Sequence, residues 1–507
     1  MSGFVRTFDE HLRNFVDRCD VAVVGSGPGG AVVAWQLAEA GYDVVLLEEG
    51  PPFQPEDFVT DGSAAIGRLL RDDGLRTTRG NLRMPTMQAI ALGGGSLVNS
   101  AICVRPPAST LAGWAEEFEL GVTGPEDLAP HFDAIEAALG VEATPDAVQG
   151  RRNLLFRDGC RALGIAAEPI RRNVRACQGS GECFTGCRAR AKQSTDVALV
   201  PRAVAAGARV YASARVGQVL SHGRRVTGVG GRTVRPLCGE SGAAFRVEAR
   251  AVVLAAGCLA TPLLLERSGL AGASGECGRN LQFHPGVAVM GIFDDPTEPV
   301  FGATQGYHSL AFLDRGYKLE TLWGPPGVMA VRLPGQGLAY KENLARIKNA
   351  AIWDAIASCN RSHGRVRAKR GSLDPLLDWN LDHRDLPILS EALWTLARIF
   401  FAAGARTILP GVAGLPDEMR SLDEARVLRT APIRPQDLLC SGNHVFGTTR
   451  MHGDPRRGVA DEFGRCHAAE NLFVADTGLL PRSPAVNPML VTMALAHRVA
   501  GAVAAAL

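Results

Sequence analysis

The chain lacks several features that would place it in a specialised class of protein. Its 507 residues contain no run of about 18 uncharged apolar residues, the length that a membrane helix requires. The longest apolar stretch, residues 251–265, is interrupted by Gly257 and Pro262. Residues 1–18 contain no apolar segment typical of a secretory signal. We therefore expect a cytoplasmic protein without membrane partners.

An excess of charge of either sign is also missing. The sequence has 54 Lys and Arg residues against 52 Asp and Glu residues, a formal net charge of +2. Such a balance gives no electrostatic reason to expect binding of nucleic acid or of an anionic membrane surface. Only five of the basic residues are lysines, at positions 192, 318, 341, 348 and 369.

The overall composition is that of an ordinary globular protein. Hydrophobic residues make up 46% of the chain and charged residues 21%. The length leaves room for two or three domains, and we find no internal repeat or polar linker. The 12 cysteines are not expected to form disulfides in a reducing compartment.

A strand–turn–helix–strand pattern opens the chain. We predict a buried strand over residues 21–24, a glycine turn over 25–30, a helix over 31–40 and a second strand over 43–48. Two parallel strands joined by a helix indicate an α/β domain. Further short strands are predicted at 208–211, 216–220, 226–229 and 251–255, a helix from 257 to 268, and a C-terminal helix over 488–507.

The turn has the pattern expected of a dinucleotide-binding site. In Gly25-x-Gly27-x-x-Gly30 the first glycine permits a tight turn, the second lets the backbone approach a pyrophosphate, and the third allows close packing of helix on strand. Glu48 ends the second strand, where its carboxylate can accept hydrogen bonds from a ribose. A second glycine cluster, Gly93-Gly94-Gly95-Ser96-Leu97-Val98-Asn99, can bring backbone N–H groups to a distant part of a long cofactor such as FAD.

Six further landmarks follow in order along the chain. They are residues 92–99, Val252 to Pro262, Gly278 to Pro285, His444 to Thr448, Asn471 to Asp476, and Asn487-Pro488. Together with the first glycine turn, these segments resemble the glucose–methanol–choline (GMC) oxidoreductases, a family that binds FAD. The resemblance spans most of the chain.

The resemblance implies a fold class and a domain layout. We expect an α/β protein with a Rossmann-like FAD-binding domain interwoven with an α+β substrate domain on an antiparallel sheet. The FAD-binding domain is predicted over residues 1–110, 195–290 and 436–507. Residues 111–194 form a connecting region, and residues 291–435 form the substrate domain.

The resemblance also implies which residues surround the cofactor. Besides Gly25, Gly27, Gly30 and Glu48, it places Gly93, Gly94, Gly95, Ser96 and Asn99 along the isoalloxazine and diphosphate. Val216 is expected to contact the adenine through its backbone. Asp476, Pro488 and Met489 are expected near the ribityl and flavin end, although Asp476 could instead cap a helix.

Oxidation of an alcohol requires a base for the hydroxyl proton and a group that orients the oxygen. A histidine suits the base, since its ordinary pKa of roughly 6.5 lies near working pH. Eleven histidines compete for this role, and the residues alone do not choose among them. The family resemblance implies that His444 is the base and Asn487 its partner. It also implies that His284 serves packing or hydrogen bonding near the flavin.

Three cysteines lie close together in the sequence. Cys177, Cys183 and Cys187 have the spacing C-x5-C-x3-C. Three thiolates fit a [3Fe–4S] cluster better than a four-cysteine cubane, and the loop resembles that of FAD-dependent glucose dehydrogenase catalytic subunits. Arg188 stands where those loops have proline. A structural loop of reduced thiols, zinc binding and a disulfide remain alternatives.

The resemblance implies an FAD-dependent alcohol dehydrogenase or oxidase that uses oxygen or an external electron acceptor. The expected substrate is a primary alcohol on a polar, sugar-like molecule, such as the 6′-hydroxyl of an aminoglycoside intermediate. Its ammonium groups would need carboxylates, for which Glu320, Asp354 and Asp378 are available. Alternatives are a neutral sugar, a cyclitol, a sterol alcohol, a lyase that keeps FAD without net redox turnover, or a non-catalytic electron carrier.

Overall fold

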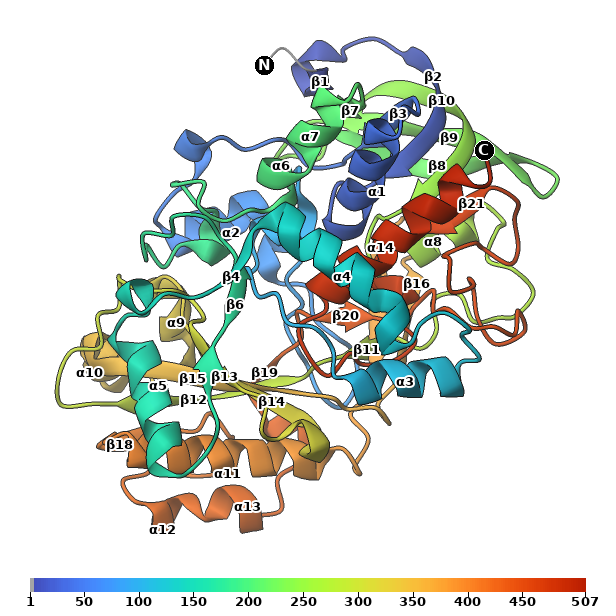
Figure 1. Ribbon diagram of the computed structural model, residues 1–507. Helices are drawn as coiled ribbons and strands as arrows, with labels where there is room; N and C mark the ends of the chain where they lie inside the picture. Colours follow the sequence, from blue (N-terminus) through green and yellow to red (C-terminus); the bar gives the residue numbers. More distant parts are fainter. Residues whose placement is uncertain (1–3) are drawn as a thin grey trace.

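The computed structural model describes residues 4–507. A large sheet forms its upper half (Figure 1). Five parallel strands lie in the order β1–β7–β3–β2–β10, followed by the antiparallel strands β9 and β8, and β21 adds a further parallel pairing to β10. The strands are β1 (Val5–Arg6), β2 (Phe15–Val24), β3 (Val44–Leu47), β7 (Arg209–Tyr211), β8 (Ala214–His222), β9 (Arg225–Val234), β10 (Ser241–Leu254) and β21 (Leu472–Val474).

Two helices from opposite ends of the chain pack together against this sheet. They are α1 (Pro28–Glu39) and α14 (Met489–Ala504), which lie side by side in Figure 1. Their apolar residues are buried in one core with the strands β2, β3 and β10. Helix α1 begins three residues earlier than predicted because Pro28 suits the first turn of a helix.

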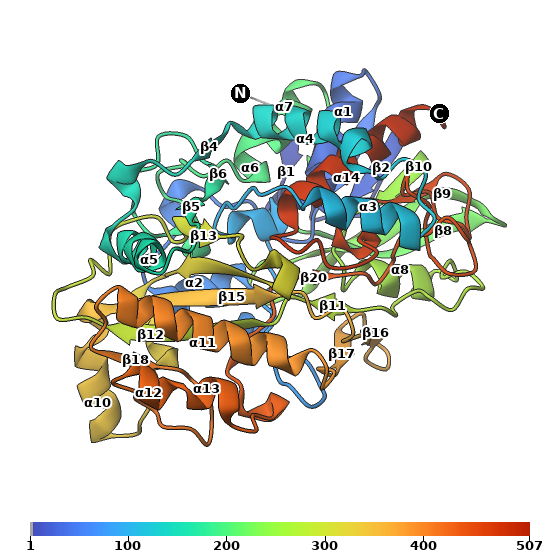
Figure 2. The same ribbon diagram turned by 60° about the horizontal axis from the view of Figure 1, so that its bottom comes forward.

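A second, antiparallel sheet forms the lower half of the molecule. Its order is β18–β12–β15–β14–β13–β5, and β19 pairs with the other end of β12. The strands are β5 (Glu168–Pro169), β12 (Gly286–Ile292), β13 (Tyr307–Ser309), β14 (Tyr317–Leu322), β15 (Ala350–Ala357), β18 (Thr407–Leu409) and β19 (Cys440–Ser441). Helix α11 (Leu386–Ala402) covers one face (Figure 2).

Alternation along β14 separates two environments. Tyr317 and Leu319 join the apolar core beneath α11, together with Trp353 of β15. Lys318 and Glu320 therefore point from the opposite face of the sheet. Both are buried. This polar pair in the middle of a buried strand marks the face where the site lies.

These elements confirm the expected fold class, an α/β body interwoven with a body built on an antiparallel sheet. The upper sheet takes strands from residues 5–47, 209–254 and 472–474, and the lower sheet from 168–441. Strand β12 begins at Gly286 and β19 lies at 440–441, both inside ranges that the sequence assigned to the FAD-binding domain. The exact domain limits stay a prediction.

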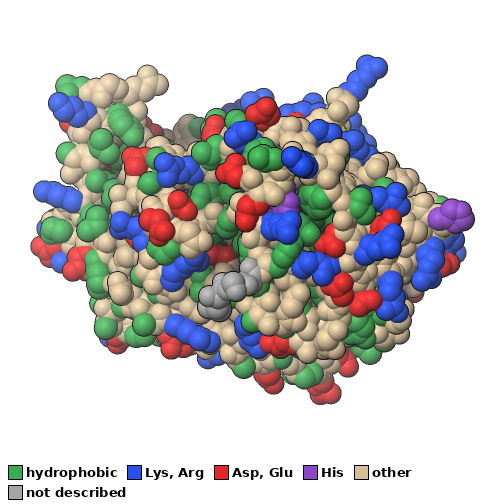
Figure 3. Space-filling view, turned by 90° about the horizontal axis from the view of Figure 1, so that it is seen from above, with side chains coloured by type: hydrophobic (Ala, Val, Ile, Leu, Met, Phe, Trp, Pro, Cys, Tyr) green, Lys and Arg blue, Asp and Glu red, His purple; other side chains and the backbone are tan. Residues whose placement is uncertain are grey.

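The surface agrees with the balanced composition. Acidic and basic side chains are interspersed over the face in Figure 3. Among residues 4–507, no helix combines the length and the apolar character that crossing a membrane would need.

Candidate active site and flavin site

The first glycine turn connects β2 to α1. Gly25 has φ +99°, and a Cβ there would lie 2.2 Å from the carbonyl oxygen of Ala255. At Gly30 a Cβ would lie 1.9 Å from the oxygen of Gly25, whereas at Gly27 the nearest atom would be 4.0 Å away. Glycine is therefore required at positions 25 and 30, where a side chain would clash with the backbone. The space at Gly27 stays open, so a phosphate can approach the N-terminus of α1 there.

Glu48 lies directly after β3, beside this turn. Its Oε2 accepts hydrogen bonds from the N–H and the hydroxyl of Ser26, at 2.9 and 2.7 Å, and its Oε1 accepts one from the Gly50 N–H at 2.8 Å. Burial raises the pKa of Glu48, and the hydrogen bonds from Gly50 and Ser26 partly oppose that shift. The acid is therefore held rigidly at the end of a parallel strand, as dinucleotide binding requires.

The second glycine cluster lies against the first. Gly93 has φ +102° and donates its N–H to the Ser26 hydroxyl at 2.8 Å, and the short helix η4 (Gly94–Leu97) follows. A Cβ at Gly95 would meet nothing within 4 Å. The hydroxyl of Ser96 is buried and donates to the Gly93 oxygen at 2.6 Å. The two glycine segments thus lie against each other, since a Cβ at Gly94 would lie 2.8 Å from the Cα of Gly27. This arrangement fits a long dinucleotide such as FAD.

The other predicted cofactor residues occupy varied positions. Asn99 donates from Nδ2 to the Met489 sulfur at 2.9 Å, which joins this segment to the start of α14, where Pro488 is the cap residue. Val216 is buried in β8 and pairs with Gly231. Asp476 caps the short helix η11 (Thr477–Leu479) through Gly478 and accepts from Thr261 at 2.5 Å. FAD contacts by these side chains stay predictions.

His444 and Asn487 meet although 43 residues separate them. His444 precedes the short strand β20 (Val445–Phe446), and Asn487 stands just before α14. The Nε2 atom of His444 lies 3.5 Å from Nδ2 of Asn487. A ring nitrogen and an amide donor therefore converge beside the segment that carries Asn99.

Sequence reasoning missed the third member of this cluster, Lys318. Its Nζ donates to Glu320 Oε2 at 2.5 Å and to Asn487 Oδ1 at 2.7 Å, and the side chain has no exposed surface. Burial alone would raise the pKa of Glu320, but the charge of Lys318 and its hydrogen bond lower it below the ordinary value. The sequence did contain a signal for this residue: a lysine lies within a buried strand, in a chain that has only five lysines.

His444 is a neutral base in this setting. Burial lowers its pKa to about 4, with Glu320 opposing the shift and Lys318 adding to it. His284, just before β12, places its Nδ1 3.2 Å from Nδ1 of His444. Burial, together with the proximity of His444 and of the Lys318 ammonium, holds the pKa of His284 well below its usual value. Both imidazoles are therefore uncharged near neutral pH.

Glu320, Asp354 and Asp378, the carboxylates expected to bind a cationic substrate, differ in whether they are free to do so. Glu320 already pairs with Lys318. Asp354 is buried and stands opposite Glu320 across the β14–β15 pairing, and its Oδ1 has no hydrogen-bond partner among the described residues. Burial, together with the negative charge of Glu320, raises the pKa of Asp354 well above its usual value.

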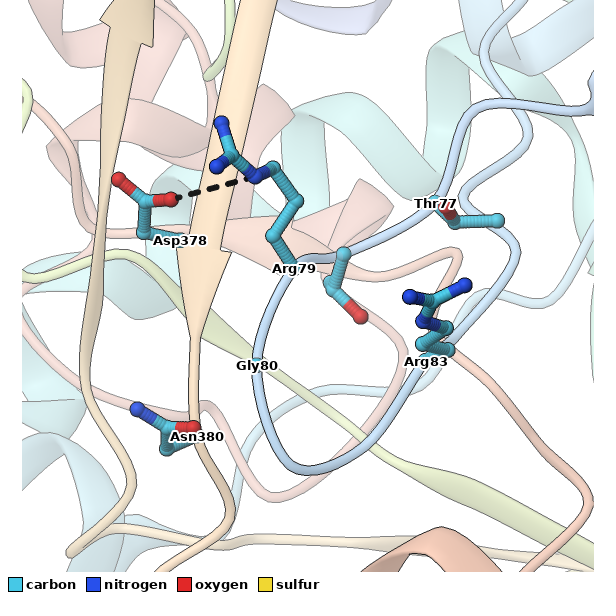
Figure 4. A pocket seen from close by; sticks show the side chains of 7 residues that line it. Thr77, Arg79, Gly80, Arg83, Asp378 and Asn380 are labelled. Carbon is cyan, nitrogen blue, oxygen red and sulfur yellow. Dashed lines mark ion pairs between the residues drawn. The ribbon is translucent and has the colours of Figure 1, made fainter.

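Asp378 lies elsewhere, on the hairpin of β16 (Gly364–Ala368) and β17 (Pro375–Trp379). It pairs with Arg365 and Arg367 of the facing strand and lies 3.9 Å from Arg79 (Figure 4). Asp378 and Arg79 border an open cavity of about 560 Å³ that neither His444 nor Asn487 lines. Asp378 is therefore not part of the cluster around His444.

The three predicted metal ligands surround one very small cavity. Cys177, Cys183 and Cys187 line a space of about 10 Å³ together with Arg172 and Lys192. Arg172 donates to the Cys177 sulfur at 3.6 Å. Within residues 4–507, no group of three or more His, Cys, Asp or Glu side chains is arranged to hold a metal ion. The structure therefore does not support the predicted [3Fe–4S] cluster or zinc, and all three cysteines are free thiols.

A dinucleotide-binding sheet, a second antiparallel sheet, and the pair of half-buried His444 and buried Asn487 between them define a flavin-dependent oxidoreductase. Family comparisons make the assignment specific. The N-terminal model of the GMC oxidoreductases matches residues 59–286, and the C-terminal model matches residues 360–496. A model of NAD(P)-binding Rossmann-like domains matches residues 23–53. The chain belongs to the GMC oxidoreductase family and is an FAD-dependent alcohol oxidoreductase.

Individual relatives span most of the chain. An uncharacterised GMC-type oxidoreductase of Mycobacterium tuberculosis is 37% identical over 96% of this chain and 76% of its own length. The long-chain-alcohol oxidase FAO3 of Arabidopsis thaliana is 27% identical over 95% of this chain and 67% of its own. Paromamine 6′-oxidase of Streptomyces fradiae is 26% identical over 96% and 91%.

Solved structures agree with the fold. Pyridoxine 4-oxidase superimposes with a TM-score of 0.72 at 20% identity and covers 96% of this chain and 99% of its own. This likeness supports the arrangement of the two sheets.

Proposed function

We propose that the protein oxidises a primary alcohol on a polar, sugar-like substrate to the aldehyde. The observation that carries this proposal is the convergence of His444 Nε2 and Asn487 Nδ2, 3.5 Å apart. A neutral imidazole accepts the hydroxyl proton, and the amide donates a hydrogen bond to the same oxygen. Bound FAD would supply the acceptor for the hydride that leaves the carbon.

The charged groups around His444 and Asn487 support these roles of proton acceptor and hydrogen-bond donor. Lys318 donates to Oδ1 of Asn487 at 2.7 Å. This contact orients the amide so that Nδ2 lies beside His444 and can donate to the reacting oxygen. The pKa of about 4 at His444 keeps the imidazole uncharged, and so able to accept a proton, throughout the neutral range. Gly27, Gly95 and Glu48 would hold the dinucleotide, and Asn99 and Met489 would flank its reactive end.

Asp354 supports a polar substrate over a plain long-chain alcohol. Its Oδ1 is buried and receives no hydrogen bond from residues 4–507, and leaving such an oxygen unsatisfied costs about 1–3 kcal/mol. A substrate hydroxyl or ammonium group would satisfy it. An aminoglycoside intermediate oxidised at its 6′-hydroxyl is the substrate that we favour, and paromamine 6′-oxidase is a relative at 26% identity.

The electron acceptor is proposed to be oxygen or a soluble external acceptor. The cysteine loop is given no part in electron transfer, since its thiols are not arranged as a metal site. We further propose that the protein works in the cytoplasm without membrane or nucleic-acid partners.

The test is anaerobic mixing of FAD-loaded protein with paromamine, glucose, a cyclitol, cholesterol and 1-dodecanol. Loss of flavin absorbance with paromamine, together with formation of the aldehyde, would support the proposal. Loss with 1-dodecanol alone would overturn the polar substrate class. If no alcohol bleaches the flavin while a hydroxynitrile is cleaved, the protein is a lyase and the proposal fails.

A further inference from the structure

The hydrogen bonds around His444 continue through three more side chains toward the protein surface. His284 Nε2 lies 2.6 Å from the hydroxyl of Ser483, and that hydroxyl donates to Ser358 Oγ at 2.9 Å. His284 and Ser483 are buried, whereas Ser358 is half-buried. The chain of contacts runs from the reacting oxygen position to the end of β15.

The direction of every donor in this chain follows from Lys318. An ammonium can only donate hydrogen bonds, so the amide atom of Asn487 that faces Lys318 must be the acceptor Oδ1. The other amide atom, Nδ2, therefore faces His444. Nε2 of His444 must then accept, and the neutral ring carries its proton on Nδ1. That proton can only be donated to Nδ1 of His284.

The same reasoning extends to the serines. Because His284 accepts at Nδ1, its own proton is on Nε2 and is donated to Ser483. Ser483 also accepts from the Ala485 N–H at 3.0 Å, so both of its acceptor positions are filled and its single proton is donated to Ser358. From His444 to Ser358, each proton is thus donated in the direction that leads away from His444.

We propose that His284, Ser483 and Ser358 form a relay that carries the substrate's hydroxyl proton from His444 to solvent. As the O–H bond of the alcohol breaks, Nε2 of His444 gains its proton and Nδ1 passes one to Nδ1 of His284. Nε2 of His284 passes one to Ser483, Ser483 passes one to Ser358, and Ser358 releases one to water. Each group ends with as many protons as it had, and one proton reaches solvent.

The exit of the relay lies at the edge of the lower sheet. The Ser358 N–H donates to the oxygen of Gly316 at 2.8 Å, where η7 (Leu313–Arg315) turns into β14. The neighbouring Arg315 side chain is 60% exposed. A proton delivered to Ser358 is therefore close to bulk water, whereas one left on His444 would lie beside the cation of Lys318.

The inference rests on the proposed function. One of its two tests therefore uses no substrate, so that it can fail independently of that function. In FAD-loaded protein with ¹⁵N-labelled histidine, NMR at neutral pH should place the proton on Nδ1 of His444 and on Nε2 of His284. The Ser483→Ala variant should change the His284 signals. The Ser309→Ala control removes another buried hydroxyl, one that donates to Ala166, and should leave them unchanged. A proton on Nε2 of His444 in the wild type would overturn the relay.

The second readout follows proton release with a pH-indicator dye, using the alcohol that bleaches the flavin fastest in the panel above. Ser483→Ala and Ser358→Ala should release the proton about tenfold more slowly than the wild type and Ser309→Ala. Ser358 lies at the half-buried end, so its variant tests the relay even where Ser483→Ala fails to fold. Equal release rates in all four proteins would overturn the relay. If no alcohol reacts, the proposed function fails, while the NMR result still decides the order of the protons.

Discussion

The polar cluster around His444 and the cysteine loop around Cys183 both gather reactive side chains, but they are built differently. Lys318 lies on β14 of the lower sheet, His444 just before β20 and Asn487 just before α14. The polar atoms of Asn487 contact both of the other side chains. The three cysteines belong to one irregular segment with few mutual constraints, and their thiols are not arranged as a ligand set. Convergence of rigid elements from distant parts of the sequence is the stronger sign of a reactive site.

The two regions also differ in what their buried lysines, Lys318 and Lys192, contact. Lys318 contacts a carboxylate and an amide side chain, so its charge acts on the groups that surround the reacting oxygen. The ammonium of Lys192 instead donates its hydrogen bonds to backbone oxygens, those of Leu97, Asn99 and Cys183. Its ammonium ties the cysteine loop to the segment next to the flavin site. One lysine therefore shapes reactivity and the other shapes the backbone.

The largest effect is expected from removing the base. His444→Ala should lower kcat by about 10²–10⁴-fold, because proton transfer from the alcohol loses its acceptor. Steady-state rates with the best alcohol of the panel measure this, and flavin content should stay at the wild-type level. The control is His383→Ala, whose side chain is 88% exposed. Turnover at the wild-type rate in His444→Ala would show that another group takes the proton.

Breaking the buried ion pair should be the next largest effect. Lys318→Met leaves the Glu320 carboxylate buried without its cation, which should cost about 3–5 kcal/mol of stability. Thermal unfolding of the FAD-loaded protein measures the loss. Lys341→Met, at an exposed position, is the matched control.

The double variant Lys318→Met/Glu320→Gln separates charge from shape. It should regain much of the stability, because no uncompensated charge remains. Its activity should stay low, since the amide of Asn487 is no longer oriented. A Lys318→Met protein as stable as the control would contradict the burial of this pair.

Much of the fold could be predicted from the sequence because the signals are local. The glycine turn at 25–30, apolar strands and Glu48 lie within one short segment, and the structure confirms the strand–turn–helix unit there. Residues 216–220 and 226–229 were predicted as short strands, but they belong to the long pair β8 and β9, since polar residues at their ends are paired across the hairpin. The bounds of such strands depend on partners that local patterns do not show.

The site was harder to predict for the same reason. Family motifs named His444 and Asn487, yet nothing in the sequence connects Lys318 to them, since 169 residues separate Lys318 from Asn487. Ser483 and Ser358 have no motif at all. Their roles depend on the packing of β14 and β15 against the segment before α14, which is a property of the tertiary structure.

A smaller effect is expected at Lys192. Lys192→Met removes the hydrogen bonds donated to the oxygens of Leu97, Asn99 and Cys183, at a cost of about 1–3 kcal/mol for each oxygen that no other donor reaches. Because Leu97 and Asn99 adjoin the glycine cluster, FAD affinity should fall together with thermal stability. Titration of apoprotein with FAD measures this. Lys348→Met serves as the control, and unchanged FAD affinity in Lys192→Met would show that the two segments are not coupled.

The smallest effect should come from the cysteines themselves, which makes them the sharpest contrast with His444. Serine at positions 177, 183 and 187 keeps the size of each side chain but removes thiolate ligands. Since these thiols are not arranged to hold a metal, the triple variant should keep its flavin and its alcohol oxidation, within about twofold in rate. Anaerobically purified wild-type protein should contain less than about one iron per flavin, where a [3Fe–4S] cluster would give about three. Three irons in the wild type and none in the triple variant would mean that the loop rearranges around a cluster, and the cysteine loop would then be a second reactive site.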